Sequence, residues 1–137
     1  MIAAMEIIDI LNVAMRWVHI SSMTIVVGGL LCLWICCGVT DAALSARAAA
    51  AYRPFFLTSA VLVLVSGVYN FLNKTGLTPA YHAVIGIKFL LVLHVLAAGF
   101  LATRSSSPKR GRQALGAAIT GFTILALSAV LRKLSMH

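Results

Sequence analysis

The chain has 137 residues, of which 61% are hydrophobic and only 10% are charged. Soluble domains carry about 45–50% apolar and about 25% charged residues, so this composition excludes a soluble globular protein and a disordered one. Eleven lysines and arginines stand against three acidic residues, which gives a formal net charge of +8. The basic residues lie mostly between apolar runs. This positive charge therefore indicates interaction with the lipid bilayer and not with nucleic acid.

Four apolar runs follow one another along the chain, each near the roughly 20 residues that cross a bilayer core. They cover residues 11–38, 54–73, 82–103 and 113–131. Charged or turn-forming stretches that contain Gly, Pro, Ser and Asn separate them. Short connections make successive helices antiparallel neighbours. We therefore predict a single all-α membrane domain, an antiparallel four-transmembrane-helix bundle.

The basic residues between the runs predict how the bundle is oriented. One side receives six of them, namely Arg47, Arg53, Arg104, Lys109, Arg110 and Arg112. The other side receives three, namely Lys74, Arg132 and Lys133. An excess of Lys and Arg marks the cytoplasmic side of a membrane protein, so we expect both termini outside.

Small residues in two of the runs predict where helices approach closely. The first run contains Gly28 and Gly29, and the fourth contains Gly116, Ala117, Thr120 and Gly121. Such residues let helix backbones meet in the membrane, either within one bundle or between two copies. Packing inside the bundle and a homodimer face are both consistent with them.

Four ionisable residues lie inside the predicted spans and are the candidates for function. Arg16 and His19 lie in the first span, and Lys88 and His94 lie in the third. Such residues cost roughly 2.5–3.5 kcal/mol at the centre of a membrane helix, so they are functional candidates by default. The first and third spans run in the same direction. We expect Lys88 and His19 in the outer half of the bilayer and His94 nearer the middle.

A haem b would satisfy all four residues. Haem iron takes imidazole ligands, the macrocycle is apolar, and the propionates need cations. We therefore predict His19 and His94 as iron ligands and Arg16 and Lys88 as propionate partners, with His82 or Lys88 as alternative second ligands. In the competing interpretation, each histidine is a core residue that hydrogen-bonds a neighbouring carbonyl or hydroxyl group.

Two short motifs resemble a known superfamily. The first span contains Arg-Trp-Val-His at 16–19 and Val-Gly-Gly-Leu at 27–30. The third contains Tyr-His at 81–82, then a lysine, an aliphatic run and a histidine at 88–94. These stretches resemble the CopD-like copper-resistance membrane domain and the HemJ-type protoporphyrinogen oxidases.

The resemblance implies a four-helix membrane protein that binds haem b and is often dimeric. In the HemJ branch the first-helix histidine and the third-helix lysine are the characteristic polar positions, which correspond here to His19 and Lys88. Lys88 is accordingly the candidate catalytic residue if the protein is a membrane oxidoreductase. We expect the protein in a bacterial inner (cytoplasmic) membrane.

Three functions from different classes stay open on the sequence. The leading one is a haem b protein for electron transfer, with or without HemJ-like porphyrinogen oxidation. The second is a CopD-like copper transporter, in which Met15, His19, Met23 and the three cysteines supply soft ligands. The third is an accessory subunit of a larger redox or photosynthetic complex, where a histidine binds a chlorophyll magnesium.

Overall fold

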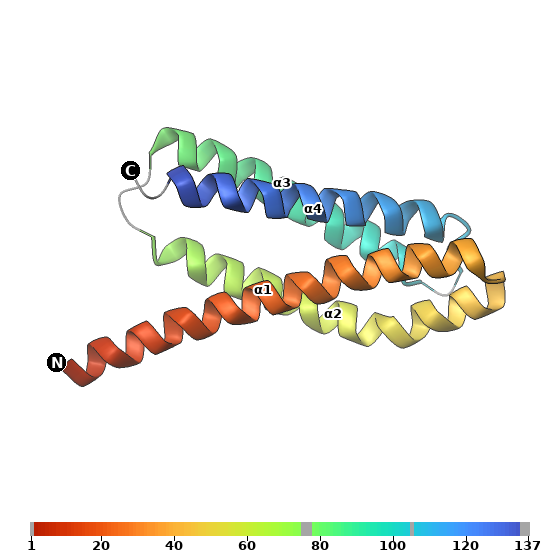
Figure 1. Cartoon of the computed structure of the whole chain (residues 1–137), viewed down its shortest axis with the longest axis horizontal. Helices are drawn as coiled ribbons and strands as arrows, with labels where there is room; N and C mark the ends of the chain where they lie inside the picture. The colour runs from red at the N-terminus through yellow and green to blue at the C-terminus, as the bar shows by residue number, and fades with distance from the viewer. Residues whose placement is uncertain (1, 75–77, 105, 135–137) are drawn as a thin grey trace.

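The computed structural model describes residues 2–74, 78–104 and 106–134, and this part of the chain is helical apart from short connections. Its four helices are α1 (Ile2–Val39), α2 (Ala42–Leu72), α3 (Pro79–Ala102) and α4 (Arg110–Leu134). All four are long and apolar enough to cross a membrane. They run antiparallel in sequence order, with both chain ends at one end of the bundle (Figure 1). The predicted all-α, four-helix membrane fold is confirmed.

The helices do not contact one another evenly. α1 packs along both α2 and α4, and α3 packs along α4, whereas α2 and α3 touch each other little. Around the bundle the order is therefore α2, α1, α4 and α3, as the ribbon also shows (Figure 1). The weak contact between α2 and α3 leaves space between these two helices, and a cavity lies on that side of the bundle.

Small residues permit the close helix contacts. Three glycines each face a large side chain of another helix: Gly29 faces Tyr52, Gly99 faces Phe56, and Gly121 faces Val27. A Cβ atom at any of these positions would overlap the facing side chain. Gly29 and Gly121 thus serve packing inside the bundle, which is one of the two roles predicted for them. Gly28 and Gly116 have open space where a Cβ would lie, so the described structure gives them no such role.

The second helix begins earlier than the sequence pattern predicts. Charge at 41–53 and the proline at position 54 indicate a connection there, but α2 starts at Ala42 and passes through Pro54. The side chain of Asp41 caps this helix by accepting a hydrogen bond of 2.7 Å from the backbone N–H of Leu44. Alanine-rich sequence then propagates the helix. The charged stretch at 42–53 is therefore helical and not a connection, and the start of the second span at residue 54 stays a prediction.

Arg110 connects three helices at the end of the bundle that carries the α1–α2 and α3–α4 connections. Its side chain is 7% exposed. The guanidinium donates hydrogen bonds to the carbonyl oxygens of Ala102 (3.1 Å) and Arg104 (2.8 Å) and to the hydroxyl of Ser45 (3.3 Å). One of the six basic residues used to predict orientation therefore holds α2, α3 and α4 together.

Candidate functional site

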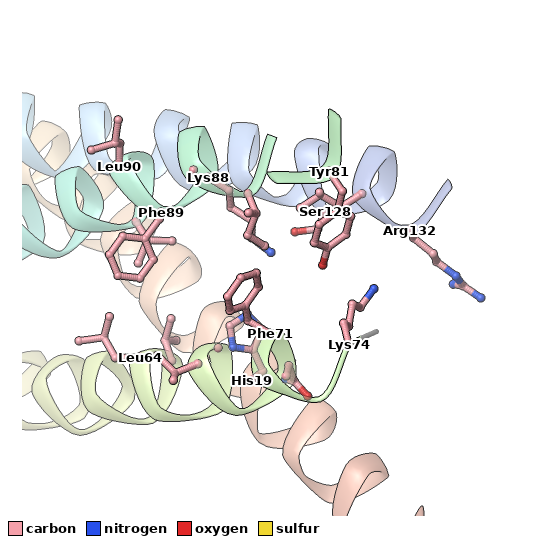
Figure 2. A pocket seen from close by; sticks show the side chains of 18 residues that line it. His19, Leu64, Phe71, Lys74, Tyr81, Lys88, Phe89, Leu90, Ser128 and Arg132 are labelled. Atoms are coloured by element: carbon pink, nitrogen blue, oxygen red, sulfur yellow. The ribbon is translucent and has the colours of Figure 1, made fainter. Parts of the chain in front are cut away.

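A cavity of about 500 Å³ opens on the side of the bundle where α2 and α3 separate, toward the end that carries the chain termini. We call it the α2–α3 cavity. Its polar lining residues are His19, Asn70, Lys74, Tyr81, Lys88, Ser128 and Arg132, and the remaining lining residues are apolar or glycine. All four helices contribute to the lining. Figure 2 shows His19 and Phe71 on one side of this space and Lys88 and Tyr81 on the other.

The ring of His19 is held by a chain of two hydrogen bonds. Its Nδ1 lies 2.9 Å from the hydroxyl oxygen of Ser66, a residue with no exposed surface. The single Ser66 hydroxyl proton is directed at the carbonyl oxygen of Leu62, 2.5 Å away. Ser66 must therefore accept from His19, which places the proton on Nδ1 and leaves the lone pair on Nε2. The imidazole lines the cavity, and in its neutral form Nε2 is the nitrogen that is left to accept.

Gly67 provides the space for this ring. A Cβ atom at position 67 would lie 3.3 Å from Cε1 of His19, closer than an ordinary van der Waals contact. Sequence analysis finds neither Ser66 nor Gly67, because both contact His19 only after α1 and α2 have packed. Serine and glycine are common in membrane helices, so their presence alone carries no signal for a site.

Lys88 enters the cavity from α3. Its side chain is half-buried, and its ammonium points into the cavity (Figure 2). Within the described residues, no hydrogen bond or ion pair to this ammonium is present, and none of the chain's three acidic residues lines the cavity. A cation in such a place needs an anion or water to offset its lost hydration.

Lys74, just after α2, adds positive charge at the edge of the cavity. Its ammonium lies 5.2 Å from the centre of the Tyr81 ring, within the range of a cation–π interaction. Partial burial, and to a smaller extent the positive charge of Arg16, lower the pKa of Lys74 below its ordinary value of 10.5. The polar part of this site is therefore cationic.

The structure brings together two of the four residues predicted to bind the cofactor. His19 and Lys88 line the same cavity, as expected. Arg16 is exposed and does not line it, although its charge acts on Lys74. His94 lines a second cavity, so the geometry does not support one haem held between His19 and His94. His82, the alternative ligand, is exposed and does not line the α2–α3 cavity.

No cluster for a bare metal ion is preformed in the described part of the chain. No group of three or more His, Cys, Asp or Glu side chains gathers there. The three cysteines are free thiols, and Cys32 is exposed on the outer surface of α1. Copper binding, for which the sequence analysis also uses Met15 and Met23, stays a prediction.

No protein-family model, curated protein or solved structure matches this chain. The resemblance to CopD-like and HemJ-type proteins therefore stays a hypothesis based on the short motifs around His19 and Lys88. The site combines an apolar cavity, the imidazole of His19 and the ammonium of Lys88, which has no partner among the described residues.

Proposed function

We propose that the protein binds haem b in the α2–α3 cavity and serves electron transfer in the membrane. The observation that carries this proposal is the unpaired Lys88 ammonium in the same apolar cavity as the free Nε2 of His19. A ligand for this site must be largely apolar, must carry an anionic group, and must offer a centre that an imidazole can bind. Haem b has all three properties.

The residues present fit each part of such a ligand. The cavity volume of about 500 Å³ lies within the roughly 300–1,000 Å³ typical of cofactor and ligand sites. Apolar side chains such as Leu64, Phe71 and Phe89 would contact the macrocycle, and His19 would hold the iron through Nε2. Lys88 and Lys74 would hold the propionates by charge. When bound, haem supplies a one-electron redox centre.

Porphyrinogen oxidation is the second candidate function, and the same pair of residues favours it. A porphyrinogen also carries carboxylates, which Lys88 could bind. The Nε2 of His19 would accept a proton in the same cavity, as general-base catalysis requires, and the electrons would pass to an acceptor from outside the chain, such as a membrane quinone. Lys88 would then be a catalytic residue that orients the substrate. The two candidates differ in whether the chromophore stays with the purified protein.

An absorption spectrum of the purified protein tests the proposal. We expect a Soret band with b-type visible bands in the natural protein. His19→Ala should lose or strongly alter this spectrum, because the imidazole ligand is removed. His82→Ala is the matched control, since that imidazole is exposed and does not line the cavity. A natural protein that neither retains nor rebinds haem would refute the haem proposal, and porphyrinogen turnover by that protein would support the second candidate.

His94→Ala separates the two models of iron ligation. The geometry favours a haem with His19 as its imidazole ligand, so His94→Ala should keep the spectrum. Loss of the low-spin spectrum in His94→Ala would restore the pair of ligands predicted from the sequence.

A further inference from the structure

The second cavity lies between α3 and α4 at the opposite end of the bundle, and the proposed haem site does not use it. We call it the α3–α4 cavity. It has a volume of about 310 Å³ and is lined by His94, Ala98, Leu101, Lys109, Arg112, Gln113 and Gly116. On α3 the lining residues His94, Ala98 and Leu101 follow one another at intervals of four and three residues. Near the start of α4 the intervals between the lining residues are three, one and three residues. Each set therefore forms one stripe along its helix.

The polar groups of this cavity lie at different levels along the helix axes. Lys109 and Arg112 lie at the end of the bundle, and both are exposed. His94 lies seven residues before Leu101, which corresponds to about 10 Å along α3 at 1.5 Å per residue. Ala98 and Gly116 leave an apolar passage between the two levels. The cavity thus has a cationic mouth, an apolar wall and an imidazole deeper in the membrane.

All these polar groups can donate hydrogen bonds, and three lack a partner in the described structure. Gln113 accepts a hydrogen bond of 2.6 Å from the Ser107 hydroxyl on its carbonyl oxygen, so its NH₂ group is left to donate. The exposed imidazole of His94 has no hydrogen bond to any described residue. A partner stabilises a polar ring inside a membrane span, and none of the described residues supplies one to His94. The side chains of Lys109 and Arg112 likewise make no ion pair with a described residue.

We propose that the α3–α4 cavity is a binding site for an anionic phospholipid. Lys109 and Arg112 would bind the phosphate at the mouth, and Gln113 would donate to the same headgroup. His94 would donate to an ester carbonyl of the glycerol region. Basic pockets between membrane helices bind anionic headgroups by charge, and the apolar wall suits the start of the acyl chains. The site is independent of the proposed haem function.

Lipid binding to the full-length protein in neutral detergent micelles tests this proposal. Phosphatidylglycerol is titrated against the protein, and bound lipid is counted by native mass spectrometry, with phosphatidylcholine as the uncharged comparison. We expect preferential retention of phosphatidylglycerol. The double variant Lys109→Gln/Arg112→Gln should bind it about 30-fold more weakly, since each basic residue at a membrane surface contributes roughly a factor of five.

The double variant Arg47→Gln/Arg104→Gln is the matched control. It removes the same charge at the same end of the bundle from two exposed arginines that do not line the cavity. This control should bind phosphatidylglycerol as the natural protein does. Equal losses in both double variants would mean general surface attraction and would overturn the site. Equal binding of phosphatidylcholine, or displacement of the lipid by millimolar inorganic phosphate, would also overturn it.

Filling the cavity tests the site without a change of charge. A Cβ at Gly116 meets nothing within 4 Å, so Gly116→Leu should occupy the apolar passage without distorting the helices. We expect it to reduce phosphatidylglycerol binding at least tenfold. Gly38→Leu is the control, because Gly38 also has open space around it and does not line the cavity. Unchanged lipid binding by Gly116→Leu would refute the assignment.

Discussion

The hydrogen bond from His19 to Ser66 gives the sharpest test of the haem site. Ser66→Ala removes only the hydroxyl oxygen that lies 2.9 Å from Nδ1 and keeps the small size of the side chain. The imidazole then loses the partner that fixes which nitrogen carries the proton. We expect the ring to bind iron more weakly and in a less defined orientation, because the partner that directs Nε2 into the cavity is gone.

Two magnitudes distinguish an effect on ligand binding from an effect on folding. Loss of such a hydrogen-bonded partner typically costs 10–100-fold in metal affinity, which equals about 1.4–2.7 kcal/mol. Hydrogen bonds between membrane helices contribute on average only about 0.6 kcal/mol to stability, with a maximum near 1.7 kcal/mol. Ser66→Ala should therefore lower haem affinity more than it lowers the free energy of unfolding. A purely structural role for Ser66 would give the reverse.

The assay is a haem titration of the haem-free protein in micelles, followed by the Soret absorbance and by the reduction potential of the complex. We expect weaker binding by 10–100-fold and a shifted potential in Ser66→Ala. Ser59→Ala is the control, because Ser59 is also buried in α2, at 3% exposure, and does not line the cavity. Unchanged affinity and potential in Ser66→Ala, with loss of binding in His19→Ala, would refute the role assigned to Ser66.

Three further predictions follow from the same geometry. Lys88→Met should weaken haem retention or shift its potential while membrane insertion persists, and equal haem content and potential in the variant would contradict this. Anion binding near Lys74 should weaken as pH rises through the lowered pKa of its ammonium, hence at a pH below 10.5. In a titration with protoporphyrin, Lys74→Arg should reduce this dependence. Gly29→Leu should lower the thermal unfolding temperature, since overpacking costs about 1–3 kcal/mol. Gly28→Leu should leave this temperature unchanged, because Gly28 has open space around it. Equal effects of the two substitutions would contradict the packing argument.

The sequence predicts the fold because hydrophobicity alone decides it. Four apolar runs in a chain with few charges leave no alternative to membrane helices, since every backbone polar group must be satisfied inside the segment. The ends of the helices are harder to predict. Charge at 41–53 resembles a connection, but alanine propensity and the Asp41 cap continue the helix there. The orientation with both termini outside stays a prediction, and a reporter fused after Arg112 should locate inside.

The candidate site is predictable only in part. His19 and Lys88 stand out because ionisable residues in a membrane are costly, and that cost does not depend on the partner helix. The grouping of residues depends on helix rotation, which the sequence leaves open. Lys88 and His94 are six residues apart and point about 120° away from each other on an α-helix. This angle is consistent with two cavities, one on each side of α3.

The charged residues that line the two cavities are consistent with a bound ligand in each. Each pairs an imidazole with two or more cations, and none of the chain's three acidic residues lines either one. Lys74, Lys109 and Arg112 lie in or next to the connections, where basic residues also set orientation. Lys88 cannot have that role, because it lies ten residues into the third helix and carries its charge inside the bundle. In the two proposals, the anions that offset these charges come from molecules that the protein binds: a carboxylate ligand in the α2–α3 cavity and a lipid phosphate in the α3–α4 cavity.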